Sequence, residues 1–595
     1  MKAASRLTSF TGYGAKALFR GAGMALSLTV LFIGSDCFGR GMGTNELAAL
    51  VAKDVARPVR PGGGAGDKVF WNRNSLHFMY APAFDFKFIE GAKTYRFIVT
   101  DGNLDEHVFV APQPCSSLSP VWLAVPVGYV RVRVEALDAC ERVVGIAGTR
   151  RFWKSAPYEP GAYPPKPYSY TECAKRYYRT LFSHTNTQHF LEFGRPDGYT
   201  DLLNIYPSKM NSALINGMIR YAQVDAGHKE DAIAIARRAA DYTLSISQPE
   251  GAPLAHFPPT YWKMEGQKNN FASVKYAGQN MLTYPAMVAM AYLNLHDAVG
   301  DRKYLDAALA IAETYEKLQL EDGTWFLKMW EKDGKPVVEG NGGVPVKLLP
   351  TGICSFMERL SGIAKDERWR KVADKAFAYI EEGPLKTFDF APQFEDTRPA
   401  ANHVDLTSAV AFEIARYLLQ RFPGDPARRS QAREIVRWVE DQFACWRKPC
   451  RADGRGIISE PWHGFNPVWS PVCSMEDMAY KRYRNWSESF DNWIDVPGVM
   501  EKYRWQVMIN SLAGGLACAY LDLYRLEGDE LALAKAKTLC DSIVKVQAMG
   551  PDGEIATHWV ISDLTGVKCI NNWTNCGVGA AMALQEMASV VEKGI

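Results

Sequence analysis

Two hydrophobic patterns divide the chain near residue 160. Between Lys68 and about Tyr158, apolar and polar residues alternate as they do in half-buried β-strands. Four stretches carry this alternation, namely residues 94–101, 107–112, 121–128 and 129–138. Gly, Pro and Asp residues separate them, as expected for short antiparallel strands. The pattern predicts a small β-sandwich domain, of immunoglobulin or fibronectin type III style, over residues 68–160.

After Tyr163 the hydrophobic period becomes helical and stays so. Charged, amphipathic segments lie at 171–182, 230–248, 302–320, 367–382, 426–443 and 530–547. They alternate with segments that are apolar nearly all round, at 210–222, 281–295, 346–360, 404–419, 504–524 and 573–588. Helices that are apolar on every side are buried on every side. Residues 161–595 are therefore expected to form an (α/α)6 toroid, with the apolar helices inside. A linear helical solenoid is the alternative.

The N-terminus has the features of an export signal. Lys2, Arg6, Lys16 and Arg20 precede the apolar stretch 24–33, which is too short to span a bilayer, and small residues follow. We expect a signal peptide region over residues 1–42, a Pro/Gly-containing linker over 43–67, and a periplasmic or extracellular protein of bacterial type. A membrane-anchored N-terminus is the alternative.

Charge and cysteine spacing narrow the function class. The formal net charge is only +2, from 68 basic and 66 acidic residues. Nucleic-acid-binding proteins are typically strongly basic, so this class of protein is excluded. The twelve cysteines show no metal-ligand spacing, so no metal and no other cofactor is expected. In an exported protein, Cys115–Cys140, Cys445–Cys450 and Cys569–Cys576 are possible disulfides, with burial as ordinary hydrophobic side chains as the alternative.

Long loops lead into the apolar helices, whereas the turns after these helices are short. The loops collect at one mouth of the ring, and they are rich in Trp, amides and charged side chains. Flat aromatic rings stack on the apolar face of a sugar, and polar groups bind its hydroxyls. The candidate substrate-binding residues are Lys209, Trp262, Arg398, His403, Arg504, Trp559, Asn572 and Trp573. Arg and Lys among them favour an acidic saccharide, because guanidinium and ammonium groups bind carboxylates. Many of the aromatic residues could instead only hold the loops in place.

Glycoside chemistry needs two protonatable groups that flank the scissile bond. Asp405 and Glu501 are candidates, since each precedes or begins an apolar helix. Asp405 is equally suited to a helix N-cap. Tyr503 and His558 complete the candidate catalytic set, although a lone His is often structural.

The segment 496–576, with VMEKYRWQVMIN, ATHW and NNWTNC, resembles glycoside hydrolase family 154, as does the order of sandwich and toroid. That resemblance implies an exported protein with β-glucuronidase activity in polysaccharide degradation. Glu501, Tyr503, His558 and Trp559 lie in the resembling segment, but the likeness fixes no catalytic position.

Two other functions remain open. A uronate lyase or epimerase would use Tyr503 with His558 or His403 to abstract the proton next to a carboxylate. A glycan-binding protein without catalysis would use the Trp-rich mouth alone.

Overall fold

The computed structural model describes residues 42–59, 75, 77–197, 206–262, 274–338, 343–388, 390, 409–446, 496–499, 508–550, 553–562, 566–571 and 573–592. The chain divides into residues 1–42 and 43–595. All described helices and strands belong to the second part.

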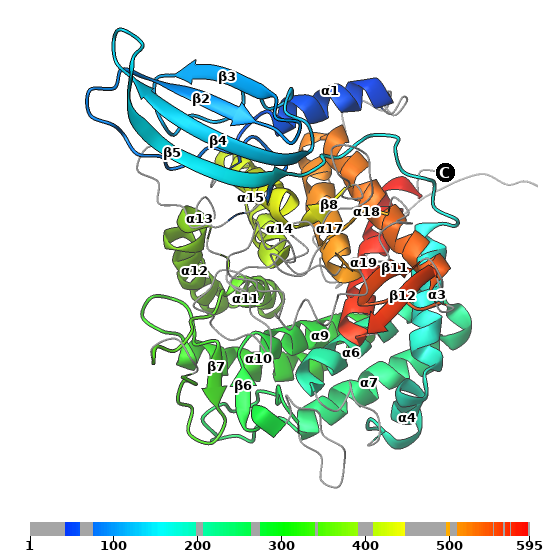
Figure 1. Ribbon diagram of the computed structural model, residues 1–595. Helices are drawn as coiled ribbons and strands as arrows, with labels where there is room; N and C mark the ends of the chain where they lie inside the picture. Colours follow the sequence, from blue (N-terminus) through cyan, green and yellow to red (C-terminus); the bar gives the residue numbers. More distant parts are fainter. Residues whose placement is uncertain are drawn as a thin grey trace, which may run out of the picture. The chain divides into compact units, whose positions relative to one another are not determined.

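Six buried helices form a closed inner ring (Figure 1). They are α6 (Pro207–Val224), α9 (Tyr284–Val299), α11 (Thr351–Ala364), α14 (Phe412–Arg421), α17 (Asn510–Glu527) and α19 (Thr574–Val591). Each packs on the next in this order, and α19 packs back on α6, so the ring closes. A closed ring excludes the solenoid, in which the two terminal helices would not meet.

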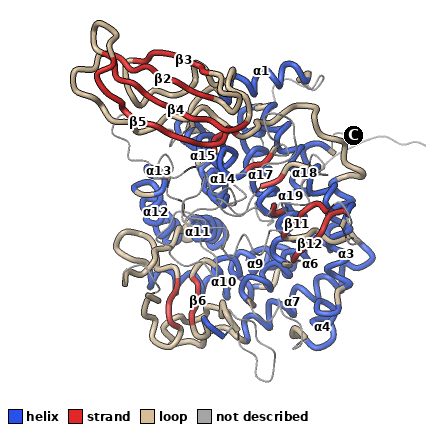
Figure 2. Tube along the Cα trace, in the orientation of Figure 1, coloured by secondary structure: helices blue, strands red, loops and turns tan. Residues whose placement is uncertain are grey.

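A second set of six helices surrounds the first, each packed on one or two inner helices. They are α3 (Tyr170–Ser183), α7 (Lys229–Ser245), α10 (Arg302–Leu318), α12 (Glu367–Glu382), α15 (Pro426–Phe443) and α18 (Glu530–Met549). These twelve helices confirm the alternation of apolar and amphipathic segments predicted from the sequence. Figure 2 shows how much of residues 161–595 is helical.

Short elements fill the connections between the helices. The helical ones are α4 (Thr185–Phe193), η1 (Ala226–His228), α13 (Pro384–Thr387) and η3 (Ala409–Ala411). The strands form two pairs, β6 (Gln279–Met281) with β7 (Lys328–Trp330) and β8 (Ala444–Cys445) with β9 (Gly498–Val499). A third small sheet has the order β10 (Met508–Ile509), β11 (His558–Ser562), β12 (Gly566–Asn571).

The N-terminal strands form one sheet in the order β1-β5-β4-β2-β3. Their bounds are β1 (His77–Phe78), β2 (Thr94–Thr100), β3 (Glu106–Ala111), β4 (Gly128–Leu137) and β5 (Val143–Lys154). The alternation in β4 is as predicted, with Val130, Val132 and Val134 fully buried. The two-sheet sandwich is not confirmed, because the described strands of this region make a single sheet. The domain boundary placed at residue 160 stays a prediction.

The strand predicted at 121–128 is wrong. Residues 121–124 form consecutive turns, with the Val121 carbonyl accepting hydrogen bonds from the Ala124 and Val125 amides, and strand β4 begins only at Gly128. Trp122 is fully buried beneath them, and its Nε1 donates to the Met79 carbonyl at 3.0 Å. Apolar residues alternate here because a turn buries its Trp and Val side chains, so the periodicity does not mark a strand.

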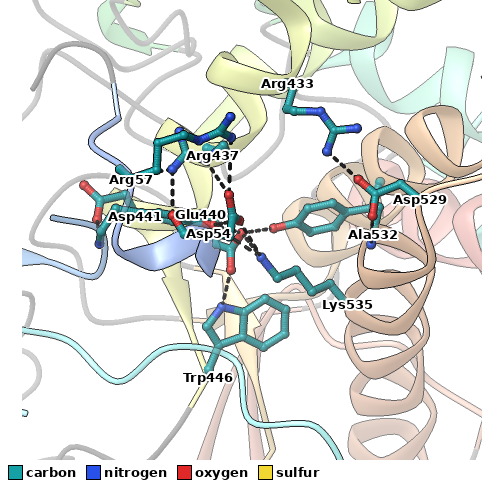
Figure 3. A network of polar contacts seen from close by, with 12 residues as sticks. Asp54, Arg57, Arg433, Arg437, Glu440, Asp441, Trp446, Asp529, Ala532 and Lys535 are labelled. Carbon is teal, nitrogen blue, oxygen red and sulfur yellow. Dashed lines mark hydrogen bonds and ion pairs between the residues drawn. The ribbon is translucent and has the colours of Figure 1, made fainter. Parts of the chain in front are cut away.

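Helix α1 (Thr44–Val55), inside the stretch expected to be a linker, joins a buried polar network with α15 and α18 (Figure 3). The Glu440 carboxylate, 1% exposed, is at its centre. It accepts hydrogen bonds from Tyr80 Oη at 2.7 Å, Trp446 Nε1 at 2.9 Å and Lys535 Nζ at 2.8 Å. Arg437 Nε donates to Asp54 at 3.0 Å. The network therefore fastens α1 and the residues leading into the sheet to the outer helices.

Cys115 and Cys140 do not form the disulfide predicted for them, and both thiols are free. Cys115 is buried near Gln113, whereas Cys140 is exposed in the turn between β4 and β5. The other two predicted pairs involve Cys450 and the Cys569 side chain, which lie outside the described part. In the described ranges, no helix is both long and apolar enough to cross a membrane.

Candidate functional site at the loop end of the helical ring

The two ends of the ring differ in how the helices begin. Short turns lead from α9, α11, α14 and α17 into the following outer helices, so each of these pairs is antiparallel. The side chains of Asp301, Asp366, Asp425 and Asp529 cap these four outer helices by accepting backbone N–H bonds. We call this the turn end.

The inner helices begin at the opposite end, here called the loop end. In all six, the N-cap side chain makes no hydrogen bond to the helix. Uncapped N-terminal turns carry N–H groups and a partial positive charge that favour oxygen-rich and anionic ligands. The ring thus brings the N-terminal ends of its inner helices together at the loop end, although Pro207 and Pro285 have no N–H and the Ala286 amide donates to Tyr315 Oη.

Lys209, in the first turn of α6, lies among aromatic rings at this end. Its Nζ is 4.4 Å from the centroid of the Trp573 ring, and about as far from Tyr206 (6.0 Å) as from Tyr284 (5.8 Å). The Trp573 and Tyr206 rings are stacked with centroids 5.7 Å apart. Since Tyr284 begins α9 and Trp573 precedes α19, the group joins the N-terminal ends of three adjacent inner helices. We call these four residues the Lys209 cluster.

A row of buried rings extends the Lys209 cluster. Tyr206 contacts Tyr261, with centroids 6.0 Å apart, and Tyr261 contacts Tyr276 at 5.2 Å. Lys328 Nζ, from β7, lies 4.3 Å from the Tyr276 centroid. The row is at most 6% exposed, whereas Trp573 and Trp262 are half-buried. The buried row therefore packs against the Lys209 cluster through Tyr206, whereas Trp573 and Trp262 keep part of their surface accessible to solvent.

Hydrogen bonds fix the loop beside the Lys209 cluster. Ser208 Oγ donates to the Pro259 carbonyl at 2.7 Å, and Asn280 Nδ2 donates to the Pro258 carbonyl at 2.9 Å. The same amide lies 3.3 Å from Glu331 Oε1, and burial raises the pKa of the Glu331 carboxyl. Because Ser208 Oγ also donates to the Pro258 carbonyl, three hydrogen bonds connect the titratable Glu331 carboxyl to the first turn of α6.

Polar side chains project from the inner face of the ring, which we define as the side of the inner helices toward its axis. Arg416 of α14 contacts Glu586 of α19 at 3.1 Å, although α17 separates these helices in the ring. It also binds Asp522 of α17 at 2.8 Å. Only a side chain that points toward the axis reaches both partners. On α9, Asn294 contacts Asn216 of α6 and Arg359 of α11, its neighbours on both sides.

Glu413 lies on the inner face one turn nearer the loop end than Arg416. Residues three apart on a helix share a face, so the Glu413 side chain has the same direction as Arg416. It is exposed, although Phe412, Ile414 and Ala415 around it are buried. Enclosure by the surrounding protein raises the pKa of the Glu413 carboxyl to about 7, and the Arg416 charge lowers it only in part.

Several buried polar atoms near the loop end have no hydrogen-bond partner. They are Asn211 Oδ1, Thr283 Oγ1, Thr351 Oγ1 and Asn575 Oδ1, in or next to the first turns of four inner helices. Buried polar atoms are nearly always paired, so unpaired ones in one region indicate a place where other hydrogen-bonding groups are accommodated. Among the described residues, no group of three or more His, Cys, Asp and Glu side chains is placed to hold a metal ion.

The structure describes only part of the predicted site. Lys209 and Trp573 lie in contact, as described above. Trp262 is half-buried and is the next residue in the sequence after Tyr261 of the buried row. Trp559 is 2% exposed and packs in a small apolar cluster with Met508 and Val546, so its ring is part of the packing. The His558 backbone pairs with Ile509 in the small sheet before α17. The remaining predicted residues lie outside the described residues: Arg398, His403, Asp405, Glu501, Tyr503, Arg504 and Asn572.

Glu413, Tyr206 and Tyr284 are not among the residues predicted from the sequence. A signal for Glu413 was present, since it is a lone carboxylate in a segment otherwise apolar around it, followed by Arg416 three residues later. That spacing predicts a polar stripe on a buried helix.

Comparisons with known proteins show likenesses of low identity. No family model matches the chain, and the curated proteins searched give no match. A solved family 76 glycoside hydrolase from a bovine Bacteroides thetaiotaomicron strain is 10% identical, covers 84% of this chain and 93% of its own, and has a TM-score of 0.44. A cellobiose 2-epimerase from Spirochaeta thermophila is 13% identical, with 71% and 98% covered and a TM-score of 0.47.

A third likeness is to an unsaturated glucuronyl hydrolase specific for heparin, 12% identical over 72% of this chain and 97% of that one, with a TM-score of 0.39. All three TM-scores lie below 0.5, so these likenesses identify neither a family nor an activity. Membership of glycoside hydrolase family 154 is not shown by them.

Proposed function

We propose that this protein is an exported carbohydrate-active enzyme, a glycoside hydrolase that acts on uronic-acid-containing glycans at the loop end of the helical ring. The Lys209 cluster carries the proposal: an ammonium group against the accessible Trp573 ring, at the uncapped end of three inner helices. An acidic saccharide matches each part of this arrangement.

The chemistry of a uronic acid explains the match. Its ring has an apolar face that stacks on an indole, as Trp573 and Trp262 allow. Its carboxylate would pair with Lys209, and hydrogen bonds that involve a charged group contribute about 1.5–3 kcal/mol. Its hydroxyls would occupy the region of the unpaired Asn211 and Thr351 atoms.

The residues predicted to do the chemistry complete the proposal. Asp405 and Glu501 precede α14 and α17 in the sequence, and as a carboxylate pair they would serve as acid and as base or nucleophile. Arg398, His403, Arg504 and Asn572 would bind the substrate. Glucuronide specificity and membership of family 154 rest on the sequence resemblance, and export rests on the N-terminal signal pattern.

One experiment tests this function directly. The purified protein is incubated with aryl glycosides and uronic-acid oligosaccharides, while released reducing sugar and ultraviolet absorbance are followed together. We expect release of glucuronate without growth of absorbance.

Other outcomes would assign other functions. Growth of absorbance would show an unsaturated product, and with it β-elimination by Tyr503 and a His. Glycan binding with no turnover of any substrate would show a binding protein and refute the enzyme proposal.

A further inference from the structure

We propose that Glu413 is the catalytic residue that donates a proton to the leaving group. This inference deepens the hydrolase proposal above and rests on it: it moves the acid role to Glu413 and leaves Asp405 or Glu501 as the base or nucleophile. The proposal is based on the position of the Glu413 side chain at the loop end and on its lack of a hydrogen-bond or ion-pair partner among the described residues.

The acidic residues on the described inner helices are six, and five of them are paired. Asp297 binds Arg359, Glu358 binds Arg421, and Asp522 binds Arg416. Glu586 is likewise bound to Arg416, and Glu527 to Arg429. These five sit in the second half of their helices, where they tie neighbours together near the turn end.

Glu413 differs from these five residues in its position along the helix and in its lack of a partner. It is the second residue of α14, at the loop end, and it makes no hydrogen bond or ion pair with any described residue. Each of the other five acidic residues has a charged partner that ties neighbouring helices together. An exposed, unpartnered carboxylate on the inner face is instead suited to a ligand.

The ring order places Glu413 opposite the Lys209 cluster. Around the ring α14 is the third helix from α6 in either direction, so their first turns face each other across the axis. A sugar held by Lys209 and Trp573 would therefore extend toward Glu413. The proposed binding group, the Lys209 cluster, and the proposed acid, Glu413, thus lie on opposite sides of the ring axis, and both belong to the described part of the chain.

The surroundings of this carboxyl leave it partly protonated near neutral pH. Enclosure raises its pKa to about 7, against the opposing effect of Arg416. Charged groups on the other inner helices include Glu358 and Arg359 of α11, Asp522 of α17 and Glu586 of α19, and the contacts above pair each of these with a group of opposite charge. The charged residues of the packed outer helix α15 include Arg428, Arg429 and Arg433, and each of these three is bound to a carboxylate. A general acid must hold its proton at working pH, which this environment favours.

The proposed step balances. The Glu413 proton passes to the glycosidic oxygen while the bond from that oxygen to the anomeric carbon breaks. Water adds its hydroxyl to the anomeric carbon, and the remaining proton of that water restores Glu413 through solvent. The products are two hydroxyl-terminated sugars, with no oxidant or co-reactant needed.

The test compares two substrates that differ only in the leaving group, 4-nitrophenyl glucuronide and methyl glucuronide. For Glu413→Gln we expect kcat/KM on the methyl glycoside to fall about 100-fold or more. The nitrophenyl substrate, whose leaving group needs little protonation, should lose about tenfold or less. Glu413→Asp keeps the acid and should retain more activity than Glu413→Gln. Circular dichroism and thermal melting establish that each variant is folded.

Two further variants serve as controls. Glu367→Gln changes an exposed carboxylate in the first turn of outer helix α12 and should keep wild-type rates. Glu331→Gln removes the other carboxylate of raised pKa near the loop end. The proposal is overturned if folded Glu413→Gln keeps wild-type rates on both substrates, if both substrates lose equally, or if Glu331→Gln shows the expected leaving-group dependence in its place. A wild-type protein that turns over no glycoside refutes the hydrolase function itself, and the role of Glu413 falls with it.

Discussion

Lys209 Nζ lies 4.4 Å from the centre of the Trp573 ring, and this contact joins the first turn of α6 to the residue before α19. The two residues are separated by most of the toroid in sequence. They meet because the ring closes between α6 and α19. The substrate site proposed at the loop end would therefore form only when the ring closes.

Replacing Lys209 by Met should reduce kcat/KM for a glucuronide about 10- to 100-fold, since the charged bond to the carboxylate is lost while the aliphatic stem remains. The matched glucoside, which lacks the carboxylate, should lose threefold or less. Steady-state kinetics on the two substrates measure the difference. Equal losses on both substrates would mean that Lys209 supports the Trp573 ring and does not bind the carboxylate.

Replacing Glu440 by Gln should lower the free energy of unfolding by about 3 kcal/mol, because the buried Lys535 ammonium group loses its nearer charged partner at 2.8 Å and keeps Asp54 at 3.7 Å. Chemical denaturation measures this change. The double variant Glu440→Gln/Lys535→Met should be more stable than the sum of the two single changes predicts, since it leaves no unpaired charge. Additive losses would show that the two groups are not coupled.

The stability of the protein should depend on pH through Asp441. Burial raises the pKa of this carboxyl from 3.8 to about 7. The hydrogen bonds that it accepts from the Met79 and Tyr80 amides lower the pKa, but by less than burial raises it. Between about pH 4 and pH 7 the folded state therefore holds a proton here that the unfolded chain has lost. The contribution of Asp441 to the free energy of unfolding falls as the pH rises through this window, and it stays low above it.

Urea denaturation between pH 4.5 and pH 8 measures this effect. Asp441→Asn, which cannot ionise, should show a less negative slope of stability against pH than the wild type. Identical slopes would show that Asp441 is already ionised in the folded state.

Close packing between inner helices should make Gly515 sensitive to enlargement. A Cβ at this position of α17 would lie 2.1 Å from Cζ of the Phe412 ring in α14. We expect Gly515→Ala to lower the free energy of unfolding by about 1–3 kcal/mol, and Phe412→Leu to recover part of the loss.

Gly362→Ala in α11 is the matched control, because nothing lies within 4 Å of a Cβ there. In that open helical position Ala should stabilise by about 0.5–1 kcal/mol. Both variants can be compared by denaturant titration, and equal effects would contradict the packing argument.

The helices were predictable because their burial is periodic. Apolar inner segments and amphipathic outer segments differ clearly in sequence, and residues such as Asp301 and Asp366 mark where outer helices begin. Strand β5 was missed because Gly145 and Gly148 interrupt its alternation. The structure explains both glycines, since a Cβ would lie 3.0 Å from Ile89 and 2.2 Å from the Phe86 ring.

The candidate site was predictable only in part. Lys209 and Trp573 were found because loop aromatics beside a cation are conspicuous in sequence. Glu413 was missed because the segment around it was treated as uniformly buried. Its exposure follows from the direction of one helix face relative to the ring axis, and that direction depends on how six helices pack together.

Closure of the ring joins its first outer helix to its last inner one. The Tyr170 amide at the start of α3 donates to Glu592, just after α19, and Tyr178 Oη donates to Gln585 within α19. During synthesis, α3 leaves the ribosome about four hundred residues before its partner exists. Until then, the apolar face of α3 that will meet α19 has nothing to cover it. Exposed apolar surface of this kind promotes aggregation, and folding of the ring is expected to finish only after translation reaches α19.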